Sequence, residues 1–457
     1  MMDLPKDFIL KYSKLLGSNA SLFFKSFNYP ATNGFIINTL KKNLEDLDDK
    51  LDSPISYIKN GYYGKISGKN IDYISGYIYS QEPSAMAVNY FANAQKNWKV
   101  LDLCASPGGK SVSIGISMSN MGLLVSNEIN YKRAKVLSSN IERMGLKNVI
   151  VTNNSPEELV KNFPHYFDMI LVDAPCSGEG MFRKNHDASN YWNSKYPYEC
   201  SIRQKKILDS AMKMLSANGY LMYSTCTFSP EENEQVISWL INKYSTLQVE
   251  KLLPKNGMIN GQPQWTNNPN NIYLSNTIRI FPHLFHGEGH FIAKLKNSDN
   301  TVLEQRKGRK KISNKNLIFN MNKDQYEIWV KFKKQTFNKE LPNSNVFLYK
   351  NILYLMPNDL PYLNNLNILR LGLKLGVFKK NRFEPSHAIS HALSPDIFRI
   401  KIKLNDDEFL KYIHGETINI NSDNNGWCLI LYHNKPFSLG KIVGNTIKNF
   451  YPKGLRE

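Results

Sequence analysis

The sequence predicts a doubly wound α/β domain with a mostly parallel sheet in the middle of the chain, and three observations lead to this prediction. From Trp98 onward, short apolar runs alternate with segments of helical periodicity. The stretch KVLDLCASPGGKS, from Lys99 to Ser111, reads as a strand, a glycine turn and the start of a helix. The chain of 457 residues exceeds one ordinary core, so further domains are expected around this one.

The apolar runs give the order of the expected elements. A helix is predicted to end near Met144, because apolar residues recur on one face up to this position and Gly145 supplies a left-handed stop. Another helix is predicted to open at Ser229, with proline next and Glu232 three residues after the cap. The predicted strands are residues 100–103, 122–129, 148–153, 167–174 and 220–226.

Changes in composition divide the chain into four expected parts. Residues 1–97, rich in aromatic and basic side chains, are expected to form an accessory subdomain, and residues 98–297 the α/β domain. Residues 298–329 read as a basic linker, with five basic residues among the six from Arg306 to Lys311. A solvated linker is the favoured interpretation of this run, and contact with phosphate is the alternative. Residues 330–457 are expected to form a further unit that contains the strand 427–433.

Charge and cysteine content indicate the partner and the compartment. The chain carries 58 Lys and Arg against 39 Asp and Glu, a net charge of +19 that favours a polyanionic partner such as nucleic acid. No signal peptide and no long apolar run is present, so a cytoplasmic protein without a membrane segment is expected. The cysteines include no C-x-x-C pair, which predicts reduced thiols without a zinc site: Cys104, Cys176, Cys200, Cys226 and Cys428.

The Gly-Gly-Lys-Ser sequence at the end of the first turn invites a nucleotide-phosphate interpretation. A P-loop requires G-x-x-x-x-G-K-[ST], and Cys104 occupies the position of its first glycine. Glycines at 108 and 109 instead let the backbone approach a ligand, and the following helix N-terminus favours a negative group such as a carboxylate. Glu128 ends the next predicted strand, where a carboxylate can accept bonds from ribose hydroxyls. Together these features suggest an adenosine-containing cofactor.

Two thiols follow two further strands at the same expected edge of the sheet. Cys176 follows Asp173, and Cys226 ends the strand 220–226. A single cysteine at such a place is more often a small buried hydrophobe, but two beside a carboxylate suit thiolate addition to C6 of cytosine, which activates C5. Asp173 could then hydrogen-bond N3 and the exocyclic amine, and Lys110 is a candidate cation for lowering a thiol pKa. These arguments leave open which cysteine attacks.

Several motifs resemble one known family, the RNA (cytosine-C5)-methyltransferases of the NOL1/NOP2/Sun type. The motifs are LDLCASPGGKS, NEINYKRAKVLSSNIERMG, FDMILVDAPCSGEGMFRKN and YSTCTFSPEENE. Within that family, RIFPHLFHGEGHFIAKL, GVFKKNRFEPSHAI and LGKIVGNTIKNFYPKGLR resemble the bacterial RsmF-type 16S rRNA enzymes. The resemblance covers the chain from about residue 5 to its end. It implies a Rossmann-like class I methyltransferase domain, an N-terminal α+β subdomain and a C-terminal PUA-like domain, with both flanking units contacting RNA.

The resemblance also implies roles for individual residues. Cys226 would be the nucleophile, Cys176 would assist product release, and Asp173 would contact both the cytosine and the cofactor region. Where the family often carries an acid near the adenine, this chain has amides and a hydroxyl in VTNNS. S-adenosylmethionine would be held by Cys104, Ala105, Ser106, Pro107, Gly108, Gly109, Lys110, Glu128, Arg133, Asn154, Ser155 and Asp173.

The leading hypothesis is therefore methylation of cytosine C5 in the decoding region of 16S rRNA, in free rRNA or the 30S subunit, by a monomer. The same chemistry on tRNA is an alternative, because both substrates need the same catalytic residues. A non-catalytic RNA-binding assembly factor is the alternative of another class, and the presence of both Cys226 and Asp173 favours an enzyme. His286 and His290 are separated by glycines that argue against a helical metal pair, so no metal is expected.

Overall fold

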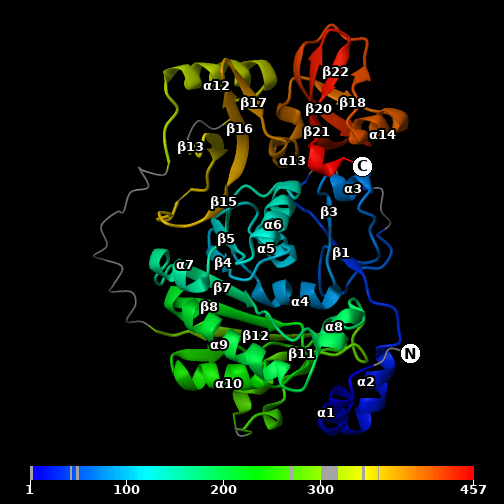
Figure 1. Ribbon diagram of the computed structural model, residues 1–457, viewed down its shortest axis with the longest axis vertical. Helices are drawn as coiled ribbons and strands as arrows, with labels where there is room; N and C mark the ends of the chain where they lie inside the picture. Colours follow the sequence, from blue (N-terminus) through cyan, green and yellow to red (C-terminus); the bar gives the residue numbers. More distant parts are fainter. Residues whose placement is uncertain are drawn as a thin grey trace.

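A mixed ten-stranded sheet crosses the centre of the computed structural model (Figure 1). Its strand order is β10-β11-β12-β8-β7-β4-β5-β6-β15, with β9 paired to β12. The inner strands are parallel: β4 (Lys99–Asp102), β5 (Leu123–Asn127), β6 (Val149–Thr152), β7 (Phe167–Asp173) and β8 (Leu215–Thr225). The structure describes residues 4–41, 44–47, 51–267, 269, 271–299, 318–341, 345–358 and 360–456.

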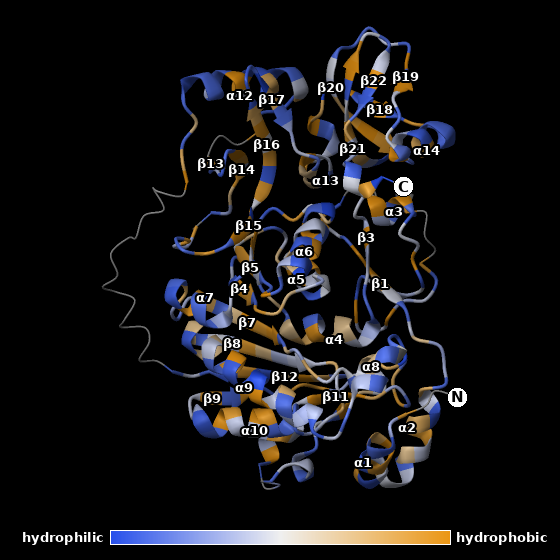
Figure 2. Cartoon of the chain, in the orientation of Figure 1, coloured by the Kyte–Doolittle hydropathy of each residue, from blue (hydrophilic) through white to orange (hydrophobic). Residues whose placement is uncertain are grey.

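The parallel core confirms the predicted α/β fold and its five strands. Near-continuous apolar runs suit these strands, because both faces of a parallel sheet are covered. The apolar residues of the strands are buried, and Figure 2 shows hydrophobic colour along the strands. Strand β8 starts earlier than predicted, at Leu215 instead of residue 220. The remaining strands are antiparallel: β9 (Leu247–Val249), β10 (Ile259–Asn260), β11 (Ile278–Ile280), β12 (His290–Asn297) and β15 (Ile368–Leu371).

Helices cover the sheet on both faces and divide the core in two. One cluster of buried side chains lies under α4 (Pro83–Ala92), α5 (Gly109–Ser117) and α6 (Tyr131–Arg143). The other lies under α7 (Pro156–Asn162), α9 (Tyr196–Met214) and α10 (Glu234–Lys243). Buried apolar area on both faces supplies the main favourable term in folding this three-layer unit.

The two helix boundaries predicted from the sequence have different outcomes. Helix α6 ends as predicted, with Gly145 at a φ of 69° directly after the cap residue Met144. The prediction that a helix opens at Ser229 is wrong, because α10 begins only at Glu234. Residues 230–233 form turns instead, and the Glu232 carboxylate accepts a hydrogen bond from the Ser177 N–H rather than capping its own helix.

The N-terminal part packs against the ten-stranded sheet and its loops in two places. Helices α1 (Lys6–Leu16) and α2 (Ala20–Ser26) bury Phe8 and Phe23 against Phe228 and Phe281 at one end of the molecule. A second element is a small antiparallel sheet of order β2-β1-β3, which leads into α4. Its members and the short helix beside it are β1 (Gly34–Ile37), β2 (Gly61–Tyr63), α3 (Ile71–Ile74) and β3 (Ile78–Ser80).

The C-terminal stretch carries two separate sheets, seen in the upper part of Figure 1. The first contains β13 (Val346–Tyr349), β14 (Ile352–Leu355), β16 (Leu373–Lys379) and β17 (Arg382–Pro385), with α12 (Lys323–Thr336) and α13 (Ala388–Ala392). The second contains β18 (Lys401–Lys403), β19 (Ile418–Asn419), β20 (Gly426–Tyr432), β21 (Lys435–Val443) and β22 (Thr446–Asn449), with α14 (Asp406–His414). Strand β20 confirms the strand predicted at 427–433.

Short elements complete the described chain. No helix in the described ranges is long and apolar enough to cross a membrane. The basic run Arg306 to Lys311 and most of the expected linker lie outside the described residues. The short helices are α8 (His186–Tyr191) and the 3₁₀ turns Gly17–Asn19, Leu44–Asp46, Glu179–Met181, Pro263–Trp265, Ile272–Asn276, Pro395–Ile397 and Lys453–Leu455.

One buried ion pair joins the N-terminal part of the chain to the C-terminal sheet. The Lys435 ammonium of β21 lies 2.8 Å from the Asp72 carboxylate of α3, and their side chains are 1% and 0% exposed. Breaking a buried pair by removing one partner leaves an uncompensated charge, which costs about 3–5 kcal/mol.

We predict that Lys435→Met lowers the free energy of unfolding by about 3–5 kcal/mol in denaturant titrations, because Asp72 is left buried without its cation. The double variant Asp72→Asn/Lys435→Met is expected to recover part of this loss. A matched control is Lys243→Met, which breaks a more exposed pair with Asp209 and is expected to cost about 1 kcal/mol or less. Equal losses for Lys435→Met and Lys243→Met would contradict the prediction.

Candidate active site

The carboxyl ends of β4, β7 and β8 meet at one edge of the sheet, and the loops that follow them carry the predicted site. Strand β7 lies between β4 and β8, with Asp173 paired to Ser224 in register. The turn after β4 leads to Lys110, the loop after β7 contains Cys176, and Cys226 follows β8 directly. The sheet therefore brings together three segments that are far apart in the sequence.

The two predicted thiols are in direct contact. The sulfur atoms of Cys176 and Cys226 lie 3.3 Å apart, and both side chains are partly buried. The hydrogen bond to Cys226, together with burial, raises the pKa of the Cys176 thiol well above its ordinary value. The raised pKa keeps Cys176 protonated near neutral pH, and either sulfur can donate the hydrogen bond between the two thiols.

A cation and a carboxylate lie beside the thiols, as the sequence predicted. Lys110 Nζ is 2.8 Å from Asp173 Oδ2, and the Ser224 hydroxyl donates to Asp173 Oδ1 at 2.7 Å. Burial works against both charges, but each partner outweighs it for the other. The pair therefore raises the pKa of Lys110 and lowers the pKa of Asp173. Both groups are charged near neutral pH.

Two buried glutamates tie the cysteine loops to each other. Glu232, in the loop after β8, accepts hydrogen bonds from the backbone N–H and the hydroxyl of Ser177, next to Cys176. The Ser177 hydroxyl lies 2.9 Å from the hydroxyl of Thr227, next to Cys226, and Thr227 donates to Glu179 at 2.8 Å. Burial raises the pKa of Glu232 to about 8, with a contribution from the neighbouring Glu179.

Glu179 extends this network to the N-terminal helix. Its carboxylate accepts hydrogen bonds from the phenol of Tyr12 in α1, from the Trp192 indole and from the backbone N–H of Phe228. Tyr12 is fully buried, and burial with the adjacent carboxylate raises the pKa of its phenol well above the ordinary value. The accessory unit therefore contacts the loop that carries the thiols through a buried polar bond.

A further imidazole stands near Asp173. His290 begins β12, and its Nδ1 lies 2.9 Å from the Ser84 hydroxyl of α4. Burial lowers the pKa of His290 to about 4, so the ring is neutral at pH 7. Its Nε2 has no hydrogen-bond partner among the described residues. Within those residues no group of His, Cys, Asp and Glu side chains could hold a metal ion.

A cavity of about 200 Å³ adjoins these groups, and its lining tests whether the predicted cofactor fits. Asp102 contributes a buried carboxylate: Oδ2 accepts a hydrogen bond from Ser111, and Oδ1 has no partner in the described chain. An unpaired buried acceptor is costly, and the ammonium of a methionine moiety is a suitable donor for it. The lining residues are Tyr79, Ser80, Gln81, Glu82, Ala85, Asp102, Cys104, Ala105, Ser106, Pro107, Gly109, Lys110 and Asp173.

Close packing around the turn explains its glycines. A Cβ on Gly109 would lie 3.0 Å from the Gln81 amide and 3.3 Å from the Tyr79 ring, and Gly108 has a φ of 120°. Any larger residue would therefore strain the backbone or narrow the cavity. The residues present fit an adenosine cofactor that carries a methionine end.

Glu128 and Arg133 lie next to the turn without lining the cavity itself. Glu128 is buried, accepts the Asn130 N–H at 2.8 Å, and lies 3.5 Å from Arg133 Nη2. Arg133 Nη2 also donates to the Ser106 carbonyl at 2.8 Å. The pair therefore holds the turn and presents a carboxylate at the end of β5.

The structure does not bring Asn154 and Ser155 into the cavity. The Ser155 hydroxyl caps α7 by accepting the Glu158 N–H. The Asn154 amide donates to Glu158 and accepts the Asn367 N–H at 3.1 Å. Both side chains have structural partners, and their contact with adenine stays a prediction.

Sequence reasoning missed four groups at this site. Asp102, Glu179, Glu232 and His290 are buried and polar at the carboxyl edge, and each lies inside one of the motifs quoted above. The sequence pattern assigns Glu232 to a helix cap and raises His290 only as a candidate metal ligand. The acids in GEGMF and SPEEN stand among apolar residues, and this pattern is a sequence signal for Glu179 and Glu232, because buried carboxylates need dedicated partners.

Four family models match successive parts of the chain. Residues 89–296 match "16S rRNA methyltransferase RsmB/F", and residues 4–83 match the N-terminal domain of 16S rRNA methyltransferase RsmF. Residues 331–393 match the first C-terminal domain of the RsmF rRNA methyltransferase, and residues 399–457 match the methyltransferase RsmF PUA domain.

Relatives from other bacteria match nearly the whole chain. "Ribosomal RNA small subunit methyltransferase F" of Vibrio campbellii is 30% identical, covering 99% of this chain and 97% of the relative. The protein of the same name from Shewanella oneidensis is 29% identical, covering 100% and 98%.

Solved structures share the fold of the catalytic part. A methyltransferase homologue from Pyrococcus horikoshii is 27% identical with a TM-score of 0.57, covering 65% of this chain and 96% of the homologue. NSun6 from the same organism, solved with SFG, is 21% identical with a TM-score of 0.56, covering 65% and 99%. The full-length matches and the four consecutive domains establish that this chain belongs to the RsmF family of 16S rRNA methyltransferases.

Proposed function

We propose that the protein methylates C5 of a cytosine in the decoding region of 16S rRNA, with S-adenosylmethionine as the methyl donor and Cys226 as the nucleophile. The observation that carries the proposal is the pair of sulfur atoms 3.3 Å apart, beside an ionised Asp173 and next to the cavity that the turn after β4 lines. Chemistry at C5 of a pyrimidine needs a nucleophile for C6 and a second group that assists the later elimination, and two thiols in contact can supply both.

The turn after β4 and its neighbours hold the cofactor in this proposal. S-adenosylmethionine supplies an electrophilic methyl group when bound. The turn Cys104 to Lys110 surrounds its methionine end, with Asp102 accepting from the ammonium and the N-terminus of α5 facing the carboxylate. Glu128, held by Arg133, accepts hydrogen bonds from the ribose hydroxyls. Asn154 and Ser155 remain the proposed neighbours of the adenine.

Cys226 attacks C6 of the target cytosine, forming an S–C6 bond while electron density moves toward C5. Cys176 is the poorer nucleophile because its raised pKa keeps it protonated. After C5 has been methylated, its proton must leave and the S–C6 bond must break. Cys176 is placed to assist this elimination by giving its proton to the departing Cys226 thiolate, because the two sulfur atoms lie 3.3 Å apart, while water takes the C5 proton.

Asp173 and Lys110 stabilise the charge that develops on the ring. The attacking Cys226 thiol releases its proton, and N3 takes up a proton in the adduct. An ionised Asp173 accepts hydrogen bonds from this protonated N3 and from the exocyclic amine. Lys110, 2.8 Å away, keeps the carboxylate ionised and fixed in place. Ser224 holds the other oxygen of Asp173, so the carboxylate has a defined direction before substrate binds.

The flanking units supply RNA binding in this proposal. Residues 1–97 and 330–457 surround the catalytic unit of residues 98–297, and the net charge of +19 favours contact with phosphates. The rRNA substrate follows from the family. We propose a cytoplasmic monomer that works on 16S rRNA or the 30S subunit, and the test below compares both with tRNA.

We predict that Cys226→Ala lowers methyl transfer by at least about 1,000-fold, because the C6 adduct cannot form. Cys176→Ala is expected to form the adduct but release it slowly, so that a protein–RNA complex accumulates on denaturing gels. Transfer of label from S-adenosylmethionine to 30S subunits, free 16S rRNA and tRNA measures both effects and identifies the substrate.

Cys428→Ala is the matched control, because Cys428 is a buried thiol in β20, which belongs to a different sheet from the one that carries the candidate active site. Its activity per folded molecule is expected to equal that of the wild type. An adduct that persists in Cys226→Ala and disappears in Cys176→Ala would reverse the two roles. Label in tRNA alone would retain the chemistry and overturn the rRNA substrate.

We predict that Glu232 makes stability depend on pH. Its pKa is raised from 4.5 to about 8, so the folded chain holds a proton that the unfolded chain loses. The associated stability is complete below about pH 4.5 and is lost as the pH rises through about 8, with a slope of up to about 1.4 kcal/mol per pH unit. Glu232→Gln mimics the protonated acid and should lack this slope in denaturant titrations between pH 5 and 8. Parallel curves for the variant and wild type would show that Glu232 does not retain its proton.

A further inference from the structure

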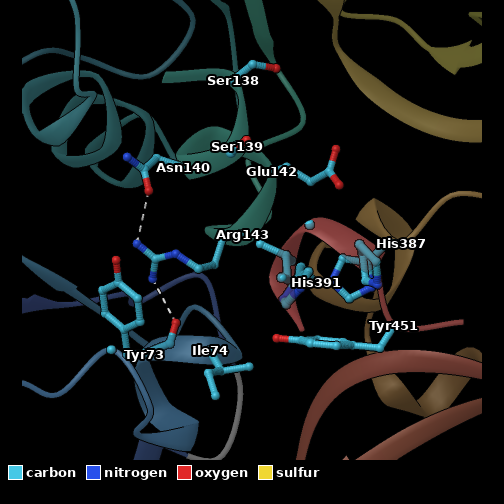
Figure 3. A pocket seen from close by; sticks show the side chains of 14 residues that line it. Tyr73, Ile74, Ser138, Ser139, Asn140, Glu142, Arg143, His387, His391 and Tyr451 are labelled. Atoms are coloured by element: carbon cyan, nitrogen blue, oxygen red, sulfur yellow. Dashed lines mark hydrogen bonds between the residues drawn. The ribbon is translucent and has the colours of Figure 1, made fainter. Parts of the chain in front are cut away.

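A pocket of about 520 Å³ lies where all four matched segments meet, outside the candidate active site (Figure 3). Tyr73 and Ile74 come from α3, Arg143 from the end of α6, His391 from α13, and Tyr451 from the chain after β22. Its volume falls in the range of ligand sites, roughly 300–1,000 Å³. Ser138, Ser139 and Asn140 add hydroxyl and amide groups along the α6 side.

The cation in this pocket lacks an acidic partner. Arg143 lies over the Tyr73 ring, 3.8 Å from its centroid, and donates to the Tyr73 carbonyl at 2.7 Å and to Asn140 Oδ1 at 3.3 Å. Arg143 is partly buried and also donates to the Ile78 carbonyl at 3.3 Å, and in the described ranges no carboxylate lies within 4 Å of its guanidinium. Buried cations are normally paired, so this arrangement leaves a place for an anion.

A second basic residue, Lys41, contacts the wall of the same pocket. Lys41 donates to the His391 carbonyl at 2.7 Å and, in the described chain, has no acidic partner within ion-pair distance. Burial, together with Arg143, lowers the pKa of Lys41 to about 7. The only acid lining the pocket is Glu142, whose carboxylate is 2.9 Å from Arg370 and therefore already neutralised. The local charge is positive without a bound anion.

Two neutral histidines form the opposite wall. His387 Nε2 and His391 Nε2 are 3.0 Å apart, and His391 Nδ1 lies 3.3 Å from the Ser75 carbonyl. Since that carbonyl needs a donor, His391 carries its proton on Nδ1 and accepts from His387. Burial lowers the pKa of His387 to about 4 and that of His391 further, with Lys41 opposing a charge on His391. The wall therefore offers aromatic faces without competing for the anion.

We propose that this junction pocket binds one nucleotide of the RNA substrate, with a backbone phosphate at Arg143 and the base or ribose against the histidine and tyrosine rings. Guanidinium groups bind phosphate strongly, and unstacked RNA bases pack on aromatic side chains. The inference rests on the RNA substrate of the proposed function and adds a contact distant from the cytosine site. A free nucleotide or inorganic phosphate presents the same chemistry, and the experiment separates these sources.

The position of the pocket supports RNA as the occupant. The backbone of the accessory unit and that of the C-terminal unit both touch the end of α6, where a Cβ on Gly76 would lie 1.9 Å from the Arg143 carbonyl and one on Gly145 would lie 2.5 Å from the His391 carbonyl. Asn140 also donates to the Pro107 carbonyl of the cofactor turn at 2.8 Å. An RNA strand that runs from the C-terminal sheets to the candidate active site, at the carboxyl edge of the ten-stranded sheet, would pass near the α6 side of this pocket.

The test introduces a negative charge at the mouth of the pocket. Ser139→Glu changes an exposed residue on α6, and the matched control Ser117→Glu changes an exposed residue on α5 that does not line the pocket. We predict that Ser139→Glu weakens binding of 16S rRNA by roughly fivefold or more, measured by fluorescence anisotropy without methyl donor. The control is expected to bind like the wild type. Losing one phosphate contact should also reduce the slope of log affinity against log salt by roughly 0.7–0.9.

A second variant removes the cation. Arg143→Gln is expected to reduce RNA affinity and the salt slope in the same way, with folding checked by circular dichroism. At saturating RNA, the control Ser117→Glu should retain the wild-type rate of methyl transfer. Because binding is measured without the methyl donor, failure of the cytosine chemistry leaves this test intact, and unchanged RNA binding leaves that chemistry intact.

Inorganic phosphate and nucleoside monophosphates, titrated by calorimetry, distinguish the sources of the anion. Weak binding of these probes that is lost in Ser139→Glu, together with weakened RNA binding, supports the proposal. Loss of probe binding with unchanged RNA affinity would assign the pocket to a free nucleotide and overturn it. Wild-type RNA affinity and salt slope in Ser139→Glu would overturn it as well.

Discussion

The candidate active site depends on buried carboxylates that hold two separate loops together. Glu232 binds Ser177 beside one thiol, and Glu179 binds Thr227 beside the other, while the two serine and threonine hydroxyls lie 2.9 Å apart. A backbone hydrogen bond from the Gly180 N–H to the Cys226 carbonyl, at 2.9 Å, joins the same two loops after β7 and β8. Hydrogen bonds to buried acids are strong when complete, and they fix geometry at the cost of desolvating the acid. The 3.3 Å separation of the sulfur atoms follows from this network.

The same network makes the N-terminal helix part of the catalytic structure. The Tyr12 phenol of α1 donates a hydrogen bond to Glu179. The aromatic cluster around Phe23 of α2 and Phe228 packs both N-terminal helices against the loop after β8. A helix whose apolar face is buried in this way has no independent core of its own. The accessory unit and the catalytic unit therefore share one hydrophobic cluster, and a contact made by α1 acts on the cysteine loops directly.

The sequence predicted the parallel strands, the end of α6 and the meeting of Cys176, Cys226 and Asp173, because these follow from local periodicity and from the edge rule for parallel sheets. It failed at Ser229, where a good local capping pattern lost to a tertiary contact of Glu232. Asp102 and His290 were missed because their significance comes from burial between elements, which no single stretch encodes. The junction pocket has the same origin, since Tyr73, Arg143, His391 and Tyr451 share no sequence pattern.

Strand β15 has a consequence for the synthesis of the chain. Ile368–Leu371 pairs with β6 at the edge of the catalytic sheet, although the two strands are separated by roughly 200 residues. An unpaired edge strand is a template for wrong pairing. While a ribosome is making this protein, the sheet keeps that edge open until the C-terminal region has emerged. The catalytic sheet therefore closes this edge only after residue 371 has been made, and the late strand then covers an edge at which finished chains could associate.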